Sequence, residues 1–304
     1  MQTTIPDAIE ARDTTLSRSL IASESPSSLA FHAFLRHRSG MVGLTITLLL
    51  ILVALSAPLL APYDALAIDA SARFVPPSPA HPFGTDEFGR DLFSRVIMGS
   101  RISLSVGFVA IGIAALLGIT TGLTAGYAGG WFDSIMMRFY DALLAFPAIL
   151  LAIVILAVLG PGGLPAMLAI AVVSVPAFAR LTRANVLVEK SKEYVQAARS
   201  VGAKPGRIAF GSIFPNVTST LLVQTVVAIA GAVLLEAALS FLGLGTPLPA
   251  PSWGSMLSIS KGYLSQAPWY GLFPGLAITL LVMGLYLLGN GLRDAFDPRR
   301  QKLK

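Results

Sequence analysis

Long runs of residues without a charged side chain alternate with short charged segments along this chain. The uncharged runs cover residues 41–61, 102–132, 142–179, 208–235 and 271–292. A helix of about 20 apolar residues is long enough to cross the hydrocarbon core of a bilayer, which is roughly 30 Å thick. Each run is long enough for at least one crossing, so the pattern predicts transmembrane helices.

The third run is too long for one crossing, because residues 142–179 form an uncharged stretch of 38 residues. Gly160-Pro161-Gly162-Gly163 lies in its middle, and Gly and Pro in succession are strong turn signals. We therefore expect two helices here, at about 134–160 and 164–180. The total is six spans, and the predicted fold class is an all-α polytopic membrane protein.

The composition supports this fold class. Hydrophobic residues make up 54% of the 304 residues and charged residues only 12%, about half the charged fraction of an ordinary globular domain. A soluble enzyme would lack polar surface at this composition, and a disordered chain needs low hydrophobicity. The chain has no cysteine, which excludes disulfides, thiolate metal sites and a cysteine nucleophile.

Lysine and arginine indicate the orientation in the membrane. Segments 1–40, 126–141, 180–215 and 293–304 together carry 17 of them, whereas 62–101 and 243–270 carry 5. The positive-inside rule places the first set in the cytoplasm. We thus expect a cytoplasmic tail at 1–40, a first helix at 41–61, an extracytoplasmic loop at 62–101, a core at 102–292 and a cytoplasmic tail at 293–304. The net charge of +6 then reflects membrane topology, and no nucleic acid partner is expected.

Recognisable catalytic chemistry is absent from the sequence. There is no G-x-x-x-x-G-K-[ST] phosphate loop, no H-E-x-x-H and no G-x-S-x-G. We therefore predict no catalytic residue, no bound cofactor and no metal site, and an intramembrane enzyme is disfavoured. A stand-alone secondary transporter or channel remains the alternative. It would be expected to show inverted repeats and ion-coupling residues at mid-membrane depth, and neither is clear.

Few ionisable residues lie near the predicted spans. They are Arg138, Asp141 and Glu236. Arg138 and Asp141 stand three residues apart and can pair on one helix face. Glu236 falls close to the outer interface, where it could be hydrated or bond the following loop. A role in a pathway and a structural role are equally open.

The segment 181–215 between the fourth and fifth spans is predicted to be a helix, a bend and a second helix. Residues 189–200 read as a short polar helix. Gly202 falls where a helix ends in a left-handed residue, and Pro205 can begin the next helix. Small Ala197 and Ala198 near the bend would let another protein approach the backbone. An ordinary connecting loop is the plainer interpretation.

The spacing Gln196-Ala197-Ala198, then Gly202, then Pro215 resembles the coupling loop of binding-protein-dependent ABC importer permeases. In that family the loop seats in a cleft of the ATPase subunit, and the resemblance extends this role to the polar helix from Glu193 onward. Gln196, Ser212 and Phe214 stand where the family usually has Glu, Ile and Leu. Gln keeps the length but loses the charge, so a salt bridge to the ATPase is not expected at that position.

Two further stretches resemble the "C-type" permeases of dipeptide, oligopeptide and nickel importers. They are residues 81–104, which include His-Pro-Phe-Gly-Thr-Asp-Glu-Phe-Gly-Arg-Asp, and residues 239–254, with Leu-Ser-Phe-Leu-Gly-Leu-Gly and Pro-Ser-Trp-Gly. The resemblance covers about 41–296. It implies the type I ABC importer architecture in a bacterial inner membrane, a second permease, two ATPases that bind ATP and Mg, and an extracytoplasmic binding protein. The implied substrate is a peptide or a related small solute such as nickel.

Several single features carry expectations of their own. The predicted extracytoplasmic cluster of Asp86, Arg90, Asp91 and Arg95 is either a contact for a binding protein or gate, or a salt-bridged cap with turns at Gly84 and Gly89. Glu236 is a further candidate for the gate. The glycines expected to allow close helix packing are Gly107, Gly112, Gly118 and Gly122. The tryptophans expected to anchor at membrane interfaces are Trp131, Trp253 and Trp269.

Overall fold

Helices make up the framework of the computed structural model, which describes residues 32–296; the predicted tails at 1–40 and 293–304 therefore lie largely outside the described residues. The membrane-length helices are α3 (Arg38–Leu55), α5 (Leu92–Ala128), α8 (Gly163–Lys190), α11 (Phe214–Phe241) and α13 (Trp269–Phe296). The shorter α-helices are α4 (Ala57–Leu60), α6 (Gly130–Leu144), α7 (Ala148–Leu159), α9 (Glu193–Ser200), α10 (Pro205–Ile208) and α12 (Trp253–Ser260). Short 3-10 turns cover Ala70–Ala72 and Lys261–Tyr263, and a π-helical stretch covers Ala209–Ile213.

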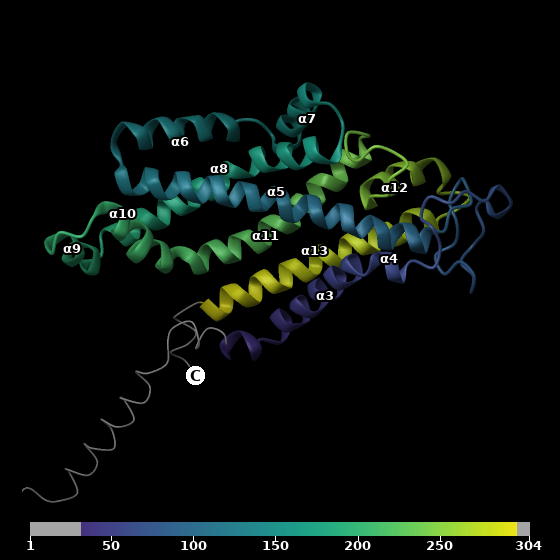
Figure 1. Ribbon diagram of the computed structural model, residues 1–304, viewed down its shortest axis with the longest axis horizontal. Helices are drawn as coiled ribbons and strands as arrows, with labels where there is room; N and C mark the ends of the chain where they lie inside the picture. The colour runs from purple at the N-terminus through teal and green to yellow at the C-terminus, as the bar shows by residue number, and fades with distance from the viewer. Residues whose placement is uncertain (1–31, 297–304) are drawn as a thin grey trace, which may run out of the picture.

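The long helices run side by side along the molecule (Figure 1). Five helical stretches within the described range are long and apolar enough to cross a membrane, and α6 with α7 makes a sixth when the bent pair counts as one span. The predicted all-α, multi-span fold is confirmed. Both described ends of the chain lie towards the end of the bundle that carries α9, as an even number of crossings requires (Figure 1).

The third predicted span is not one straight helix. Residues 134–160 are divided between α6 and α7, whose axes differ by 93°. Pro147 explains the break, because proline lacks an N–H and disfavours helical geometry at the preceding residue. Phe146 is the last residue before α7's cap, and Pro147 itself has extended backbone angles (φ −55°, ψ 131°). The expectation of a continuous helix was wrong because it used only the turn at 160–163.

Several helix ends differ from the sequence prediction. α5 begins at Leu92 rather than 102, because Oδ2 of Asp91 accepts a hydrogen bond from the Ser94 amide at 2.7 Å and caps the helix. The loop predicted to be extracytoplasmic therefore ends near 91. α8 continues to Lys190, so the predicted polar helix at 189–200 is split between α8 and α9. The segment outside the long helices is correspondingly shorter than 181–215.

The contact between α5 and α8 depends on glycine. A Cβ on Gly118 would lie 2.5 Å from the Phe178 Cβ, and a Cβ on Gly122 would overlap the Ala179 carbonyl. A Cβ on Gly107 would meet Val233 of α11 at 2.8 Å. Close packing is confirmed at these positions. The prediction of close packing is wrong for Gly112, where no atom of the described chain lies within 4 Å of a Cβ.

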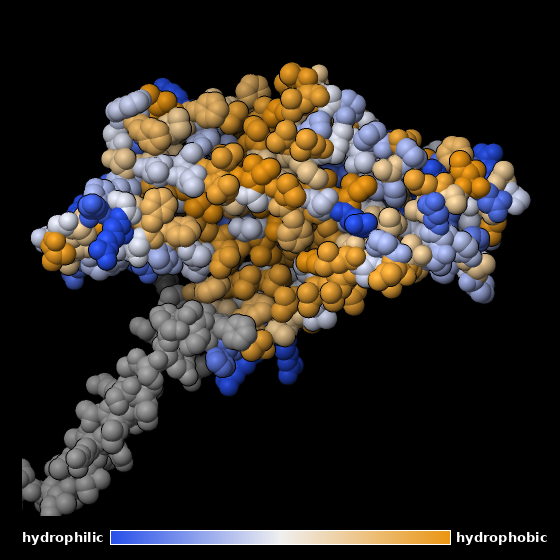
Figure 2. Space-filling view, in the orientation of Figure 1, coloured by the Kyte–Doolittle hydropathy of each residue, from blue (hydrophilic) through white to orange (hydrophobic). Residues whose placement is uncertain are grey.

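Hydrophobic side chains form a broad band around the middle of the molecule, with polar residues towards both ends (Figure 2). Trp131 is 76% exposed, as expected of an interfacial residue. Trp253 is different: it is 1% exposed, and its indole donates a hydrogen bond to the Val96 carbonyl at 2.9 Å. The prediction of an interfacial anchor is wrong for Trp253, which instead packs α12 against α5.

Candidate functional site

Helix α9 and the bend after it project from one end of the bundle (Figure 1). Glu193 lies in the first turn and Arg199 in the last, which suits the helix dipole at both ends. Val195 is the buried residue of α9, whereas Gln196 and Ala197 are exposed and Ala198 is half-buried. The helix therefore offers one polar, small-residue face to an incoming surface.

The predicted bend is present in the structure. Gly202 has φ +76°, a left-handed conformation that favours glycine. Its amide donates to the Arg199 carbonyl, and the Ala203 amide donates to the Ala198 carbonyl at 3.1 Å, so the helix end is satisfied. Pro205 occupies the first turn of α10, as predicted. No atom of the described chain lies within 4 Å of a Cβ placed on Gly202, which leaves that surface open.

An apolar anchor holds α9 to the bundle. Val195 is fully buried in a cluster formed by the ends of several helices. The other buried members are Leu123, Val186, Ile208, Ala209, Ile213, Val217 and Leu221. They belong to α5, α8, α10, the π-helical stretch and α11. One α9 side chain thus contacts a cluster that several helices share.

A polar anchor lies beside the apolar one. Glu189 at the end of α8 accepts hydrogen bonds from Lys192 Nζ at 2.6 Å and from the Tyr194 hydroxyl at 2.8 Å. The Tyr194 oxygen in turn accepts from the Asn216 amide of α11 at 3.3 Å. Desolvation, followed by the bond to the Glu189 carboxylate, raises the pKa of Tyr194 to about 12. The phenol therefore stays protonated and donates to Glu189 at physiological pH.

Cations extend the anchor to α5. Lys190 Nζ donates to the Tyr127 carbonyl at 2.6 Å. Lys190 and Arg199 both lie over the Tyr127 ring, 5.5 and 5.8 Å from its centroid, within the range of cation–π attraction. Sequence reasoning missed Tyr127, Glu189 and Tyr194. Tyr127 and Asn216 stand 63 and 22 residues from their partners Lys190 and Tyr194. Glu189 and Tyr194 are only five residues apart, but they belong to different helices.

Pro215, the last residue of the predicted coupling motif, has a different place. It lies in the first turn of α11, directly after the π-helical stretch Ala209–Ile213. Proline is accepted in a first turn because its missing N–H would be unpaired there in any case. Pro215 therefore contributes to the start of α11, whereas the exposed face comes from α9 and the bend.

The predicted extracytoplasmic cluster lies at the opposite end of the bundle. Asp86 binds Arg90 Nε at 2.7 Å and lies 3.4 Å from Arg95 Nε. Asp91 binds His81 at 2.9 Å. Arg95 also donates to the Ala65 carbonyl at 2.8 Å and is fully buried.

All four predicted side chains of this cluster are buried, with Gly84 and Gly89 at positive φ in the surrounding loop. The structure thus brings them together as an ion-paired cap at the N-terminal end of α5. Because these side chains are buried, their charged groups pair within the chain and not with solvent. Contact with a binding protein or a gate remains a prediction.

Glu236 of α11 is 1% exposed, so of the two environments considered for it, the hydrated one is not found. Its Oε1 accepts from the Ser240 hydroxyl at 2.7 Å, while Oε2 has no hydrogen-bond partner in the described chain. A Cβ on Gly254 of α12 would lie 2.7 Å from the Ser240 Cβ. The carboxyl is therefore enclosed where α12 packs on α11, and its role in a gate stays a prediction.

The expected pair of Arg138 and Asp141 does not form. Asp141 instead lies 3.7 Å from Arg180, and both side chains are exposed. Asp133 forms the stronger contact, accepting from Arg183 Nε and Nη2 at 2.5 and 2.6 Å. Both contacts join α6 to α8. The two carboxylates of α6 thus hold it against a neighbouring helix rather than stabilising α6 internally.

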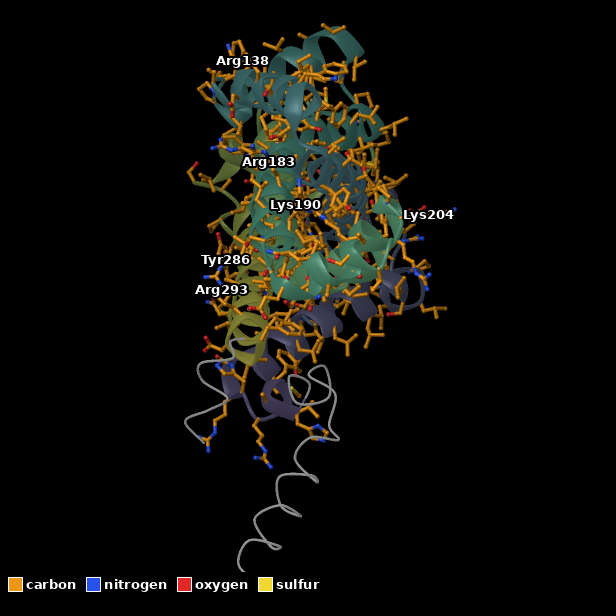
Figure 3. All side chains as sticks on the ribbon, turned by 90° about the vertical axis from the view of Figure 1, so that its left-hand side faces the viewer. Arg138, Arg183, Lys190, Lys204, Tyr286 and Arg293 are labelled. Carbon is orange, nitrogen blue, oxygen red and sulfur yellow. The ribbon has the colours of Figure 1, made fainter. Side chains whose placement is uncertain are left out.

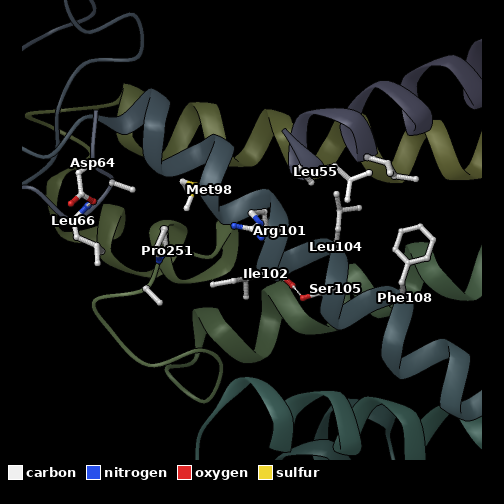
Figure 4. Close-up of a pocket in the computed structure, with 14 residues that line it drawn as sticks. Leu55, Asp64, Leu66, Met98, Arg101, Ile102, Leu104, Ser105, Phe108 and Pro251 are labelled. Carbon is white, nitrogen blue, oxygen red and sulfur yellow. Dashed lines mark hydrogen bonds between the residues drawn. The ribbon is translucent and has the colours of Figure 1, made fainter. Parts of the chain in front are cut away.

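A cavity of about 780 Å³ lies between α3, α5 and the loop before α12. Its lining is largely apolar, with Arg101 and Asp64 as charged members (Figure 4). The exposed apolar side chains Leu55 and Phe108 stand on its wall. Nothing in the described chain covers this opening.

Comparison with known proteins identifies the framework. Residues 118–302 match the family model described as "Binding-protein-dependent transport system inner membrane component", and residues 25–77 match "N-terminal TM domain of oligopeptide transport permease C". Together the two models include α9, the bend and most of the long helices.

Three curated relatives illustrate the similarity. A dipeptide transport system permease protein of Alkalihalophilus pseudofirmus is 46% identical over 275 residues, covering 90% of each chain. A glutathione transport system permease protein of Pectobacterium atrosepticum is 45% identical, covering 88% of this chain and 89% of that protein. A di/tripeptide transport system permease protein of Pseudomonas aeruginosa is 42% identical, covering 90% and 93%.

The family match covers more than half of the chain, and the relatives align over nearly all of it. The long apolar helices agree with a membrane-spanning transport subunit. The predicted family is therefore confirmed: this chain belongs to the binding-protein-dependent transport system inner membrane components, the permease subunits of ABC importers.

Proposed function

We propose that this chain is one of two permease subunits of an ATP-driven importer of short peptides. The observation that carries the proposal is the exposed, doubly anchored α9 on a chain whose relatives are named as dipeptide, di/tripeptide and glutathione permeases. The second subunit would be a homologous permease. The solute would cross between the two chains after delivery by an extracytoplasmic binding protein.

The proposed energy source lies on partner chains. Two ATPase subunits would bind ATP and Mg, and each would hold one permease through its coupling helix. In this chain the contact would be made by Glu193, Gln196, Ala197, Ala198 and Gly202. On this proposal α9 and both chain ends would lie in the cytoplasm, which the distribution of lysine and arginine supports.

A two-state mechanism follows from the anchoring of α9. Because Val195 and Tyr194 connect α9 with α8 and α11, closure of the ATPases would move the ends of these helices together. Packed helices shift as bodies between discrete arrangements. ATP binding can therefore bias the path towards one side if the ATPases contact α9 differently in the two states.

The alternative is a stand-alone secondary transporter or channel. It is tested by reconstituting this chain alone in liposomes and imposing an ion gradient. The proposal predicts no solute movement, because neither the second half of the path nor the ATPase is present. Ion-driven uptake by the isolated chain would favour the alternative.

Substrate choice is tested with the complete complex in liposomes, with ATP enclosed on the ATPase side and the binding protein outside. We expect ATP-dependent uptake of labelled di- and tripeptides, at least about tenfold above uptake of nickel ions. A tenfold ratio corresponds to about 1.4 kcal/mol of discrimination. Uptake of nickel alone, or of no peptide in an otherwise ATP-active complex, would refute the peptide proposal.

A further inference from the structure

A second, smaller groove lies at the α9 end of the bundle, between α8, α11 and α13. It encloses about 310 Å³, and Leu181 of α8 forms part of its wall. The polar side chains lining it are Ser219, Thr220, Gln224 and Arg293. Figure 3 shows Arg293 and Tyr286 of α13 on one side of the bundle.

One polar group of this groove, Gln224, stands at membrane depth. Gln224 lies ten residues after Phe214, the first residue of α11, which is about 15 Å along the helix axis. It falls near the middle of the uncharged run 208–235. A side-chain amide facing lipid at that depth would be costly, because hydrocarbon offers it no hydrogen-bond partner.

The polar side chains of the groove form no hydrogen bonds with one another. Thr218 and Thr225, on the same helix, donate to the Phe214 and Leu221 carbonyls. In contrast, the side chains of Thr220, Gln224 and Arg293 make no hydrogen bond or ion pair within the described part of the chain. They need water or a solute, so this face is poorly suited to lipid.

The charge of the groove selects among solutes. Its lining contains a guanidinium, an amide and two hydroxyls, and no carboxylate. Arginine is well suited to carboxylates, because its planar donors match their two oxygens. Every peptide with a free C-terminus carries such a group.

We propose that this groove is part of the wall of the solute path on the α9 side, and that Arg293 and Gln224 receive the carboxylate of the passing peptide. The inference rests on the proposed function, since it takes the solute to be a peptide. Its test, however, measures water access and local charge, neither of which requires peptide transport.

The absence of cysteine from the sequence permits a clean test. The complete complex carrying Thr220→Cys or Gln224→Cys in this chain is prepared in inside-out membrane vesicles without nucleotide. A membrane-impermeant anionic methanethiosulfonate is added, and modification of this chain is followed by mass. Leu222→Cys is the matched control, because Leu222 lies on the same helix and is 49% exposed on another face.

We expect both groove thiols to react at least about tenfold faster than the control, since only a wetted thiol ionises readily. Equal rates at all three positions would overturn the wall assignment, even with normal peptide uptake. Conversely, a complex that takes up no peptide in the liposome assay but keeps the labelling contrast in inside-out vesicles would refute the proposed substrate class and leave the wall assignment intact.

The role of Arg293 is tested in the Gln224→Cys background with anionic and cationic reagents of equal size. Arg293→Gln should lower the ratio of anionic to cationic labelling by about threefold or more, and Arg293→Lys should largely restore it, because the attraction is coulombic. An unchanged ratio in Arg293→Gln would overturn the carboxylate assignment.

Discussion

Gly202 combines two properties at one residue: a positive φ and an open surface. The positive φ fixes the bend after α9, and the missing side chain leaves the backbone accessible. A substitution can therefore act by straining the backbone or by obstructing a partner. The two effects are separable by the size of the new side chain.

We expect Gly202→Trp to leave the protein inserted in the membrane but to abolish ATP-driven uptake, because an indole at the bend would block the proposed ATPase cleft. Gly202→Ala is the control for backbone strain, which costs about 1–2 kcal/mol for a left-handed non-glycine residue. Alanine should retain most uptake. Normal uptake by the tryptophan variant would contradict the assignment of this surface to the ATPase.

Gln196 makes fewer contacts that a substitution could disturb. Its side chain donates to the Ser191 carbonyl at 3.3 Å and is otherwise exposed. We therefore expect Gln196→Glu to be tolerated, with uptake within about twofold of the parent, since surface substitutions usually change stability by no more than about 0.5 kcal/mol. Complete loss of ATPase binding in this variant would show that the contact has been misplaced.

At the scale of elements, α9 matters through its attachments. The hydrogen bonds that join Glu189, Tyr194 and Asn216 connect three helices, and Val195 packs into their shared cluster. A coupling element needs such attachments, because a loosely held helix could follow the ATPase without moving the spans.

Tyr194→Phe removes the hydroxyl and keeps the ring. A hydrogen bond to a carboxylate contributes about 1.5–3 kcal/mol, and less here because Tyr194 is 37% exposed. We expect the number of peptides imported per ATP hydrolysed to fall several-fold while ATPase binding persists. Glu189→Gln should behave similarly, since the weaker acceptor loosens the same bond.

Tyr263→Phe is the matched control for the ring substitution. Tyr263 lies after α12, where its ring contacts Phe74, and its hydroxyl makes no hydrogen bond within the described chain. It should import the same number of peptides per ATP as the parent. An equal coupling ratio in Tyr194→Phe and in this control would show that the hydrogen bond between Tyr194 and Glu189 does not contribute to coupling.

The α5–α8 contact offers a test of packing. Gly122→Leu would force a branched side chain against the Ala179 backbone, and overpacking of this kind costs about 3 kcal/mol. Gly112→Leu, on the same helix but with no neighbour within 4 Å in the described chain, should be nearly neutral. Thermal unfolding in detergent should show a lower midpoint only for the Gly122 variant; equal midpoints would contradict the observed packing.

The elements differ in how far the sequence could predict them. Gly202 and Pro205 act through their own backbone geometry, so the bend could be predicted locally. Pro147 is also a local signal for a helix break, but it was overlooked because it lies within the uncharged run 142–179. Hydropathy does not record contacts between distant residues, such as those of Tyr194 with Asn216 and of Lys190 with Tyr127. It also does not record the burial of Trp253 and Glu236.

At the scale of the whole molecule, polar residues gather towards the two ends, and a broad apolar band lies between them (Figure 2). The groove between α8, α11 and α13 adds polar side chains near the α9 end. An ion-paired cap closes one end, and α9 projects from the other. Single-chain reasoning identified the family from motifs at both ends. It could not identify the wall of the path, because polar residues there are scattered over two helices.

The most direct test of the account is to isolate this chain from its native membrane in mild detergent and identify its partners by mass spectrometry. We predict a second six-span permease together with ATPases that carry the phosphate loop absent here. A variant lacking residues 192–206 should retain the second permease and lose the ATPases. Recovery of the intact chain alone, under conditions that preserve other membrane complexes, would contradict the central claim that α9 couples this permease to an ATPase.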